Sequence, residues 1–169
     1  MPLTRRRLLA ALAGLATAGA AGRARADCSD PPLPAVNWRK CLHSGRDLEG
    51  ANLAGANLRE ADLSRANLEK ADLSGVDAYS ARFTSASMKK ATLDGGNFEE
   101  ADFTGVALTG ASLVGTNLRR ATLYNADLTN ADLTDASLGE ADTQNAVFSG
   151  ATWTDGNYEC REGSVGSCG

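Results

Sequence analysis

The stretch RDLEGANLAGANLREADLSR, residues 46–65, decides the fold of this chain, because its short pattern returns every five residues. From Leu48 to Tyr158 every fifth residue is large and apolar, with Ala78 and Thr143 as the exceptions. Fourteen of these 23 positions are Leu, and all four phenylalanines of the chain fall among the others: Phe83, Phe98, Phe103 and Phe148. A second column lies two residues before each large position; it holds Ala at 17 of 23 places and a charge only at Arg46.

A period of five fits neither an α-helix, which repeats every 3.6 residues, nor a strand, which repeats every two. It buries one large and one small side chain per repeat, so the chain must turn a corner at each repeat. Four such sides make a square coil, and stacked coils lie ~4.8 Å apart. We therefore predict an all-β solenoid in which residue n lies beneath residue n+20. The alternative, a disordered low-complexity tract, gives no reason for every Phe to share one phase.

The repeat resembles the motif A-(D/N)-L-x-x of the pentapeptide repeat family. Residues that match it almost unchanged are Ala51-Asn52-Leu53, Ala61-Asp62-Leu63, Ala71-Asp72-Leu73 and Ala131-Asp132-Leu133. The resemblance covers residues 46–158 and implies a right-handed quadrilateral parallel β-helix with four repeats in each coil. Twenty-three repeats then make between five and six coils.

Residues that deviate from the two columns support this register. The undersized Ala78 lies beneath the oversized Phe98, and the oversized Val76 lies beneath Gly96. Close packing requires such compensation between neighbouring layers. Phe83 and Phe103 are also twenty residues apart, so we expect an aromatic pair within one side of the core.

Residues 1–26 have the features of a signal peptide. A twin-arginine pair, Arg5-Arg6, is followed by an apolar stretch from Leu8 to Ala21 and by a small-residue cleavage signal, Ala24-Arg25-Ala26. We expect cleavage before Asp27 and a periplasmic or secreted product without a stable membrane anchor. A retained anchor is the alternative, but the apolar run is short for a bilayer. A lipoprotein attached through Cys28 would need a better lipobox than the residues before it provide.

The charge of the processed chain limits its partners. Without the five arginines of the leader, 12 Lys and Arg remain against 21 acidic residues, which gives a net charge of −9. A chain of this charge is unsuited to nucleic acid or to an anionic membrane surface.

All four cysteines follow the leader, and an even number in an exported chain indicates disulfides. Cys28 and Cys41 precede the rod, whereas Cys160 and Cys168 follow it. Because a disulfide needs Cα atoms within ~7 Å, we predict the pairs Cys28–Cys41 and Cys160–Cys168. Metal binding is disfavoured, since no C-x-x-C pair occurs and His43 is the only histidine.

These features predict four segments. They are the leader (1–26), an N-terminal cap with a short helical turn starting at Asn37 (27–45), the β-helix (46–158) and a C-terminal disulfide loop (159–169). In this interpretation Trp38 and Leu42 cover the first coil, while Trp153 and Tyr158 enlarge the last one.

One side of the predicted rod carries acids and no base among its outward residues. This candidate interaction surface consists of Asp72, Asp94, Asp132, Asp135 and Asp155. Another side carries Lys70, Lys89 and Lys90 as a basic cluster, and a further side carries Arg119-Arg120 near Glu99-Glu100. We expect no catalytic residue, no cofactor and no metal site, because a filled rod offers no pocket in which a base could activate a nucleophile.

The sequence therefore favours a non-enzymatic, exported binding or scaffold protein that presents its acidic side to an envelope protein. A first alternative, which the family resemblance implies, is a DNA mimic that inhibits a DNA-binding enzyme such as gyrase. A second alternative is an enzyme acting on envelope polysaccharides, which would require a cleft walled by loops. No oligomeric state is indicated.

The export interpretation is tested by replacing Arg5 and Arg6 together with Lys. We expect uncleaved precursor to accumulate in the cytoplasm, because a twin-arginine leader depends on that pair. Fractionation followed by immunoblotting measures the distribution, and export at the normal level would contradict this interpretation.

Overall fold

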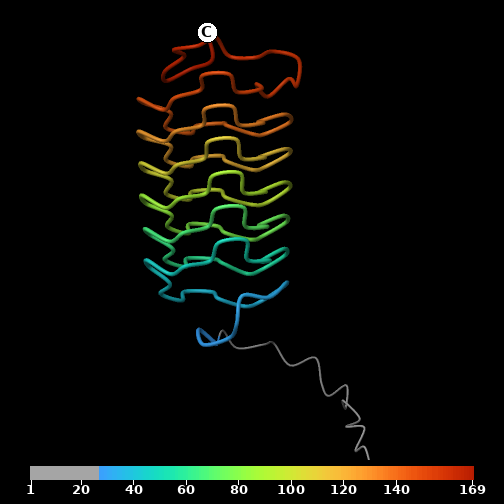
Figure 1. The fold of residues 1–169 in the computed structure, drawn as a ribbon, viewed down its shortest axis with the longest axis vertical. Coiled ribbons are helices and arrows are strands. Elements are labelled where there is room, and N and C mark those ends of the chain that lie inside the picture. The colour runs from blue at the N-terminus through green and yellow to red at the C-terminus, as the bar shows by residue number, and fades with distance from the viewer. Residues whose placement is uncertain (1–26) are drawn as a thin grey trace, which may run out of the picture.

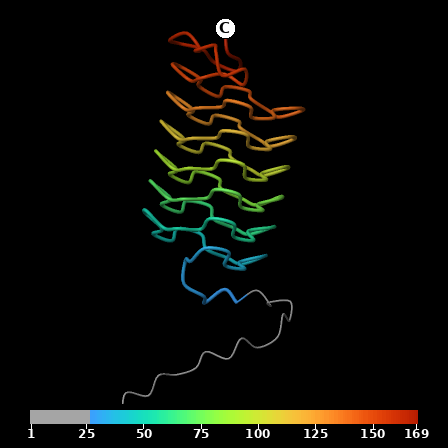
Figure 2. The same ribbon diagram turned by 90° about the vertical axis from the view of Figure 1, so that its right-hand side faces the viewer.

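The structure is a computed structural model that describes residues 27–169, and these residues wind into an upright rod (Figure 1). The predicted leader lies outside the described residues. The turned view shows the same stack of coils, with the N-terminal segment at one end and the C-terminal segment at the other (Figure 2). Within residues 27–169 the chain forms neither a helix nor an extended strand; the backbone pairs through isolated bridges instead.

The bridges join each residue n to residue n+20 in parallel, from Asn37↔Asn57 to Asp132↔Thr152. At a typical position, the amide of Leu53 donates to the carbonyl of Asp72 (2.7 Å), and the amide of Asp72 donates to the carbonyl of Ala51 (2.9 Å). The predicted stacking period of twenty is therefore confirmed, and with it the four-sided β-helix.

We number the four sides of the rod by their bridge residues. Side 1 has Asn37, Asn57, Asp77, Asn97, Asn117 and Ser137; side 2 has Leu42, Asp62, Arg82, Asp102, Thr122 and Asp142. Side 3 has Asp47, Asn67, Ser87, Ala107, Asp127 and Val147; side 4 has Asn52, Asp72, Thr92, Ser112, Asp132 and Thr152.

Each corner is a tight turn closed by a backbone hydrogen bond. The amide of Ala56 donates to the carbonyl of Leu53 (2.9 Å), and the residue before Ala56, Gly55, has a φ of +66°. Glycine adopts this left-handed conformation without a steric penalty. Many corners nevertheless use other residues, such as Arg65 with a φ of +58°. The local backbone strain at these corners is offset by the stacking of the coils.

The interior consists of the two predicted columns. The large residues from Leu53 to Leu133 are fully buried, as is Phe148, and the small residues beside them are almost completely buried. The rings of Phe83 and Phe103 are stacked, with centroids 5.1 Å apart and planes 9° apart, which confirms the predicted aromatic pair. Phe98 packs against both, at 5.9 Å from Phe83 and 5.5 Å from Phe103.

The absence of a side chain at Gly96 is required by atoms of its own and the preceding repeat. A Cβ atom at this position would lie 2.5 Å from Cε2 of Phe98 and 2.9 Å from the carbonyl oxygen of Leu93. The missing side chain therefore makes room for the ring of Phe98 in its own repeat. Ala78 is fully buried under this aromatic layer, as expected.

The N-terminal end differs from the prediction in two respects. Residues 37–42 form a bridge, a turn and a second bridge instead of a helical turn, so the repeats begin before residue 46. Trp38 and His43 occupy the large column and are buried, whereas Leu42 points outward and is 78% exposed. The physical reason is phase: positions 38 and 43 continue the column of Leu48, and residue 42 falls on an outward position.

The C-terminal end also departs from the expected register. After Trp153 the chain reverses, and the amide of Trp153 donates to the carbonyl of Tyr158 (2.6 Å). Tyr158 is 42% exposed, so it does not enlarge the last coil as predicted. The returning segment adds two antiparallel bridges to the rod, Thr152↔Glu159 and Val147↔Val165.

Thr143 contacts this returning segment. Its hydroxyl donates to the carbonyl of Gly166 (2.7 Å), and the amide of Gly166 donates to the carbonyl of Ala146 (2.8 Å). Thr143 is therefore a polar residue of the large column at the point where the C-terminal loop crosses the end of the core.

Both predicted disulfides are present. Cys28 bonds to Cys41, with their Cα atoms 5.3 Å apart, and Cys160 bonds to Cys168, with a Cα separation of 4.9 Å. Each closes a short loop at one end of the rod, and no cysteine among the described residues is free.

Replacing Gly96 with Ala tests the packing against Phe98. We expect the free energy of unfolding to fall by about 1–3 kcal/mol, because overpacking forces a buried side chain or the backbone to shift. Chemical denaturation followed by circular dichroism measures the change.

Gly139→Ala is the matched control. Gly139 also has an ordinary φ, and its added Cβ would meet only Cγ of Arg119 at 3.9 Å. We expect a change within about 0.5 kcal/mol there. Equal losses at both positions would contradict the packing explanation.

Candidate binding surface

The five predicted surface carboxylates all lie on side 4. Asp72 and Asp132 are bridge residues of this side, Asp94 is in a turn, and Asp135 and Asp155 are at corners. Asp72 and Asp132 are three coils apart, which corresponds to roughly 14 Å along the rod. The fold therefore gathers the five acids on one side but spreads them along its length. We call side 4 with these five residues the acidic side.

The hydrogen bonds of the acidic side follow a common pattern. Oδ1 of Asp72 accepts from the amide and the hydroxyl of Ser74, at 2.9 and 2.6 Å, and Oδ1 of Asp132 does the same with Thr134, at 3.0 and 2.6 Å. These bonds to Ser74 hold the pKa of Asp72 below its ordinary value. Side chain and backbone thus fix each carboxylate in place and keep Asp72 ionised.

Asp94 and Asp155 are also held through Oδ1. Asp94 accepts from the hydroxyl of Ser112 (2.6 Å) and the amide of Val114 (3.1 Å), one coil above. Asp155 accepts from the amides of Asn157 and Tyr158, each at 3.0 Å. The bonds that these carboxylates accept within residues 27–169 use Oδ1, which leaves Oδ2 available to solvent or to a partner.

The same local bond explains the Asp or Asn of the repeat motif, which the sequence alone left without a role. At most bridge positions that carry these residues, Oδ1 accepts the backbone amide two residues later, as Asn52 does from Ala54 (3.1 Å) and Asp127 does from Thr129 (3.0 Å). This Asx-type bond satisfies an amide at the corner that the backbone ladder does not use.

Ion pairs occur on each of the other three sides. On side 1, Glu60 pairs with Arg39 (3.5 Å) and Lys40 (3.2 Å), and Arg59 pairs with Asp77 (3.1 Å). Higher on side 1, Arg120 pairs with Glu99 (4.0 Å) and Glu140 (3.0 Å). Side 2 has Arg82–Asp62 (2.8 Å) and side 3 has Lys70–Glu49 (2.7 Å).

None of the ion pairs found within residues 27–169 lies on the acidic side. Exposed pairs of this kind contribute only ~0–1 kcal/mol each to stability. Their effect here is on surface potential, because they offset acids on sides 1–3 and leave those of side 4 without a base. The positive potential of the predicted cluster of Lys70, Lys89 and Lys90 is reduced in the same way, because Lys70 is paired with Glu49.

Among residues 27–169, no group of three or more His, Cys, Asp or Glu is placed to hold a metal ion. An open depression lies at the C-terminal end, lined by Thr129, Asn130, Ser149, Gly150 and residues 159–162. No histidine lines it, and the five carboxylates of the acidic side lie elsewhere.

Residues 27–169 contain no helix with the length and apolar character needed to cross a membrane.

Comparison with protein families gives one match. The family model for pentapeptide repeats matches residues 45–77, 63–100, 81–120 and 101–139, which together cover more than half of the chain. Comparison with curated proteins gives no match.

Several solved structures have the same fold. QnrB1, described as a plasmid-mediated fluoroquinolone resistance protein, is 26% identical with a TM-score of 0.66, and the match covers 70% of this chain. The chain spans 60% of the length of QnrB1. A pentapeptide repeat protein from the cyanobacterium Cyanothece 51142, Rfr23, is 28% identical with a TM-score of 0.56, over 64% of this chain and 90% of the other.

The role of the Asx-type bond is tested at Asp132. We expect Asp132→Ala to lower the free energy of unfolding by about 1 kcal/mol, because the amide and hydroxyl of Thr134 lose their acceptor. Asp132→Asn keeps an oxygen at the same place and should change stability by less than about 0.5 kcal/mol. Thermal and chemical unfolding give both values, and equal losses would show that the charge rather than the acceptor matters.

Proposed function

The chain belongs to the pentapeptide repeat family, and on that premise we propose that it is an exported, non-enzymatic binding protein whose acidic side docks a protein of the cell envelope. Members of this family are generally structural or binding proteins. The observation that carries the proposal is the segregation of charge: five carboxylates share one side without a base, while ion pairs occupy the other three sides.

The shape of the acidic side suits a protein partner. Its corner residues include Gly75, Gly95 and Gly115, so few side chains protrude between the carboxylates. A flat, rigid surface loses little conformational entropy on binding, and like charges held in fixed positions favour a basic partner and suppress acidic ones. The partner would accordingly carry Lys or Arg at intervals that match the coils.

The disulfides support an oxidising compartment. Two disulfides in a chain of this size are unusual in the cytosol, where thiols are kept reduced. This supports the proposal that the twin-arginine-like leader directs the chain to the periplasm or beyond.

The second candidate function is inhibition of a DNA-binding enzyme such as gyrase by DNA mimicry. The likeness to the fluoroquinolone resistance protein QnrB1 and the acidity of the rod favour it. The disulfides and the leader favour the first candidate, and localisation distinguishes the two, because a mature chain retained in the cytoplasm would have access to gyrase.

The docking proposal is tested with a variant that neutralises the acidic side while keeping its hydrogen bonds. The changes are Asp72→Asn, Asp94→Asn, Asp132→Asn, Asp135→Asn and Asp155→Asn. Because Asn retains Oδ1, the fold should remain while five negative charges are removed. Immobilised oxidised protein is incubated with an envelope extract, and bound proteins are quantified by mass spectrometry.

The matched control removes five charges from sides 2 and 3. Its changes are Asp47→Asn, Glu69→Gln, Asp102→Asn, Asp127→Asn and Asp142→Asn. We expect proteins that bind the wild type to be lost with the acidic-side variant and retained with the control. Retention by both variants, or loss with both, would contradict a docking role for the acidic side.

A further inference from the structure

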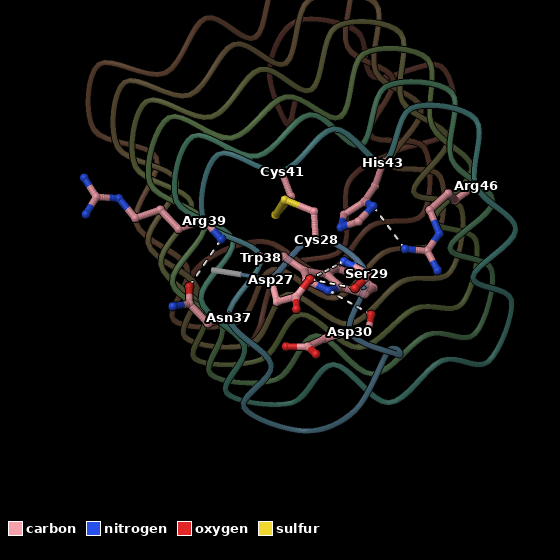
Figure 3. The surroundings of a disulfide bond; sticks show 10 residues. All are labelled: Asp27, Cys28, Ser29, Asp30, Asn37, Trp38, Arg39, Cys41, His43 and Arg46. Carbon is pink, nitrogen blue, oxygen red and sulfur yellow. Dashed lines mark hydrogen bonds between the residues drawn. A yellow bond between two sulfur atoms is a disulfide. The ribbon is translucent and has the colours of Figure 1, made fainter. Parts of the chain in front are cut away.

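His43, the only histidine of the chain, lies in the large column of the core, in the phase that Leu48 continues. It is 3% exposed and packs against Trp38, with ring centroids 4.1 Å apart. Figure 3 shows it at the N-terminal end of the rod, close to Trp38, Arg46 and the disulfide between Cys28 and Cys41. A titratable ring therefore occupies a place that the repeat otherwise gives to an aliphatic or aromatic side chain.

The hydrogen bonds of His43 define its protonation state. A guanidinium nitrogen of Arg46 lies 3.0 Å from Nδ1 of His43, and guanidinium can only donate, so Nδ1 is the acceptor. The proton of the neutral ring is then on Nε2. Nε2 is buried and has no hydrogen-bond partner. The guanidinium of Arg46 also lies over the ring of Trp38, 5.1 Å from its centroid.

The surrounding charged groups would not compensate a protonated ring. From the N-terminal segment, Asp27 is bonded to Ser29, and the backbone carbonyl of Asp30 accepts from Nε1 of Trp38 at 3.2 Å. From the coil above, the carboxylate of Asp62 is engaged outward by Arg82 at 2.8 Å. The nearest charge is Arg46, which repels a second cation. Burial and Arg46 together hold the pKa of His43 below its ordinary value of 6.5.

We propose that His43 makes the N-terminal end of the rod an acid-sensitive latch, in which protonation of the ring releases residues 27–46 while the coils above remain folded. A protonated ring cannot accept the hydrogen bond from Arg46, and it places a second positive charge beside the guanidinium in a dry site. This inference is independent of the proposed docking function.

The opening is local because of how the segment is attached. It is joined to the next coil by ladder bonds such as Trp38 to Asn57 (2.9 Å) and His43 to Asp62 (2.7 Å). The disulfide between Cys28 and Cys41 closes within the segment, so it does not tie the segment to the coil above. Solenoid units contact only their neighbours, and a terminal unit can therefore open without the rest.

The pH window follows from the direction of the shift. Since the folded pKa of His43 is lower than that of the open state, the latch is fully stable above pH 6.5 and weakens as the pH falls toward the folded pKa. Within that window the opening constant rises up to about tenfold for each pH unit, and below the folded pKa it levels off.

The test follows the oxidised protein by NMR between pH 7.5 and 4.5. The single histidine gives one imidazole titration, and amide exchange, corrected for its intrinsic pH dependence, reports local opening. We expect the ring to titrate below pH 6.5, with exchange at Trp38 and His43 rising as the pH falls. Exchange at Phe83 and Leu113 should stay constant.

Two variants separate the latch from general acid sensitivity. His43→Leu restores the usual column residue and should remove the pH dependence of exchange at Trp38. Arg46→Ala removes the neighbouring cation and should raise the titration midpoint of His43.

The proposal would be overturned by the same pH dependence in His43→Leu, by a wild-type ring that titrates at or above pH 6.5, or by an unchanged midpoint in Arg46→Ala. Amide exchange that rises at Phe83 and Leu113 together with Trp38 would indicate global unfolding instead of local opening, and would also overturn the proposal.

Discussion

The stacking of residue n beneath residue n+20 is the constraint on which the rest of the structure depends. Because every repeat buries one large and one small side chain, the two columns remain continuous only if the four sides keep this register. The backbone ladder alone would tolerate other registers, but the dry core does not, since a slip of one residue would bring outward polar groups inside. The stacked rings of Phe83 and Phe103 and the space that Gly96 leaves for Phe98 are local consequences of that rule.

The sequence predicted those parts of the molecule in which the repeat is regular. The period, the four sides, the aromatic pair and both disulfides follow from spacing and from the length of the rod, and the structure confirms them. The first repeats were missed because Trp38, Cys41 and His43 do not match the motif, although Trp38 and His43 share the phase of Leu48 and Cys41 shares that of Ala51. At the other end phase was misleading: Tyr158 has the right spacing, but a reversal of the chain after Trp153 turns it outward. A terminal repeat has a neighbouring coil on one side only, so its residues must cover the exposed end of the core and need not follow the pattern.

The candidate site was predictable in position but not in its bonding. Periodicity placed Asp72, Asp94 and Asp132 on one side, because their five-residue repeats are separated by multiples of twenty residues and must align. It did not reveal that Oδ1 of each accepts hydrogen bonds, from the same repeat at Asp72 and Asp132 and from the next coil at Asp94, since these side chains could equally have faced solvent. The distinctive property of the acidic side is therefore not the presence of acids, which occur on all four sides. It is the absence of the bases that pair with them on sides 1–3.

The two ends of the rod solve the problem of an open β-edge in different ways. At the C-terminal end the chain folds back and adds antiparallel bridges at Val147 and Thr152, so part of the edge is covered by backbone. At the N-terminal end closure relies on side chains, because Trp38, His43 and Arg46 stack beneath the core and a disulfide draws Cys28 to Cys41. Backbone pairing does not titrate in the range where imidazole does. An end closed by a buried histidine without a carboxylate partner is thus the one whose stability depends on mild acid, and a leucine at the same place would have supplied the packing without that dependence.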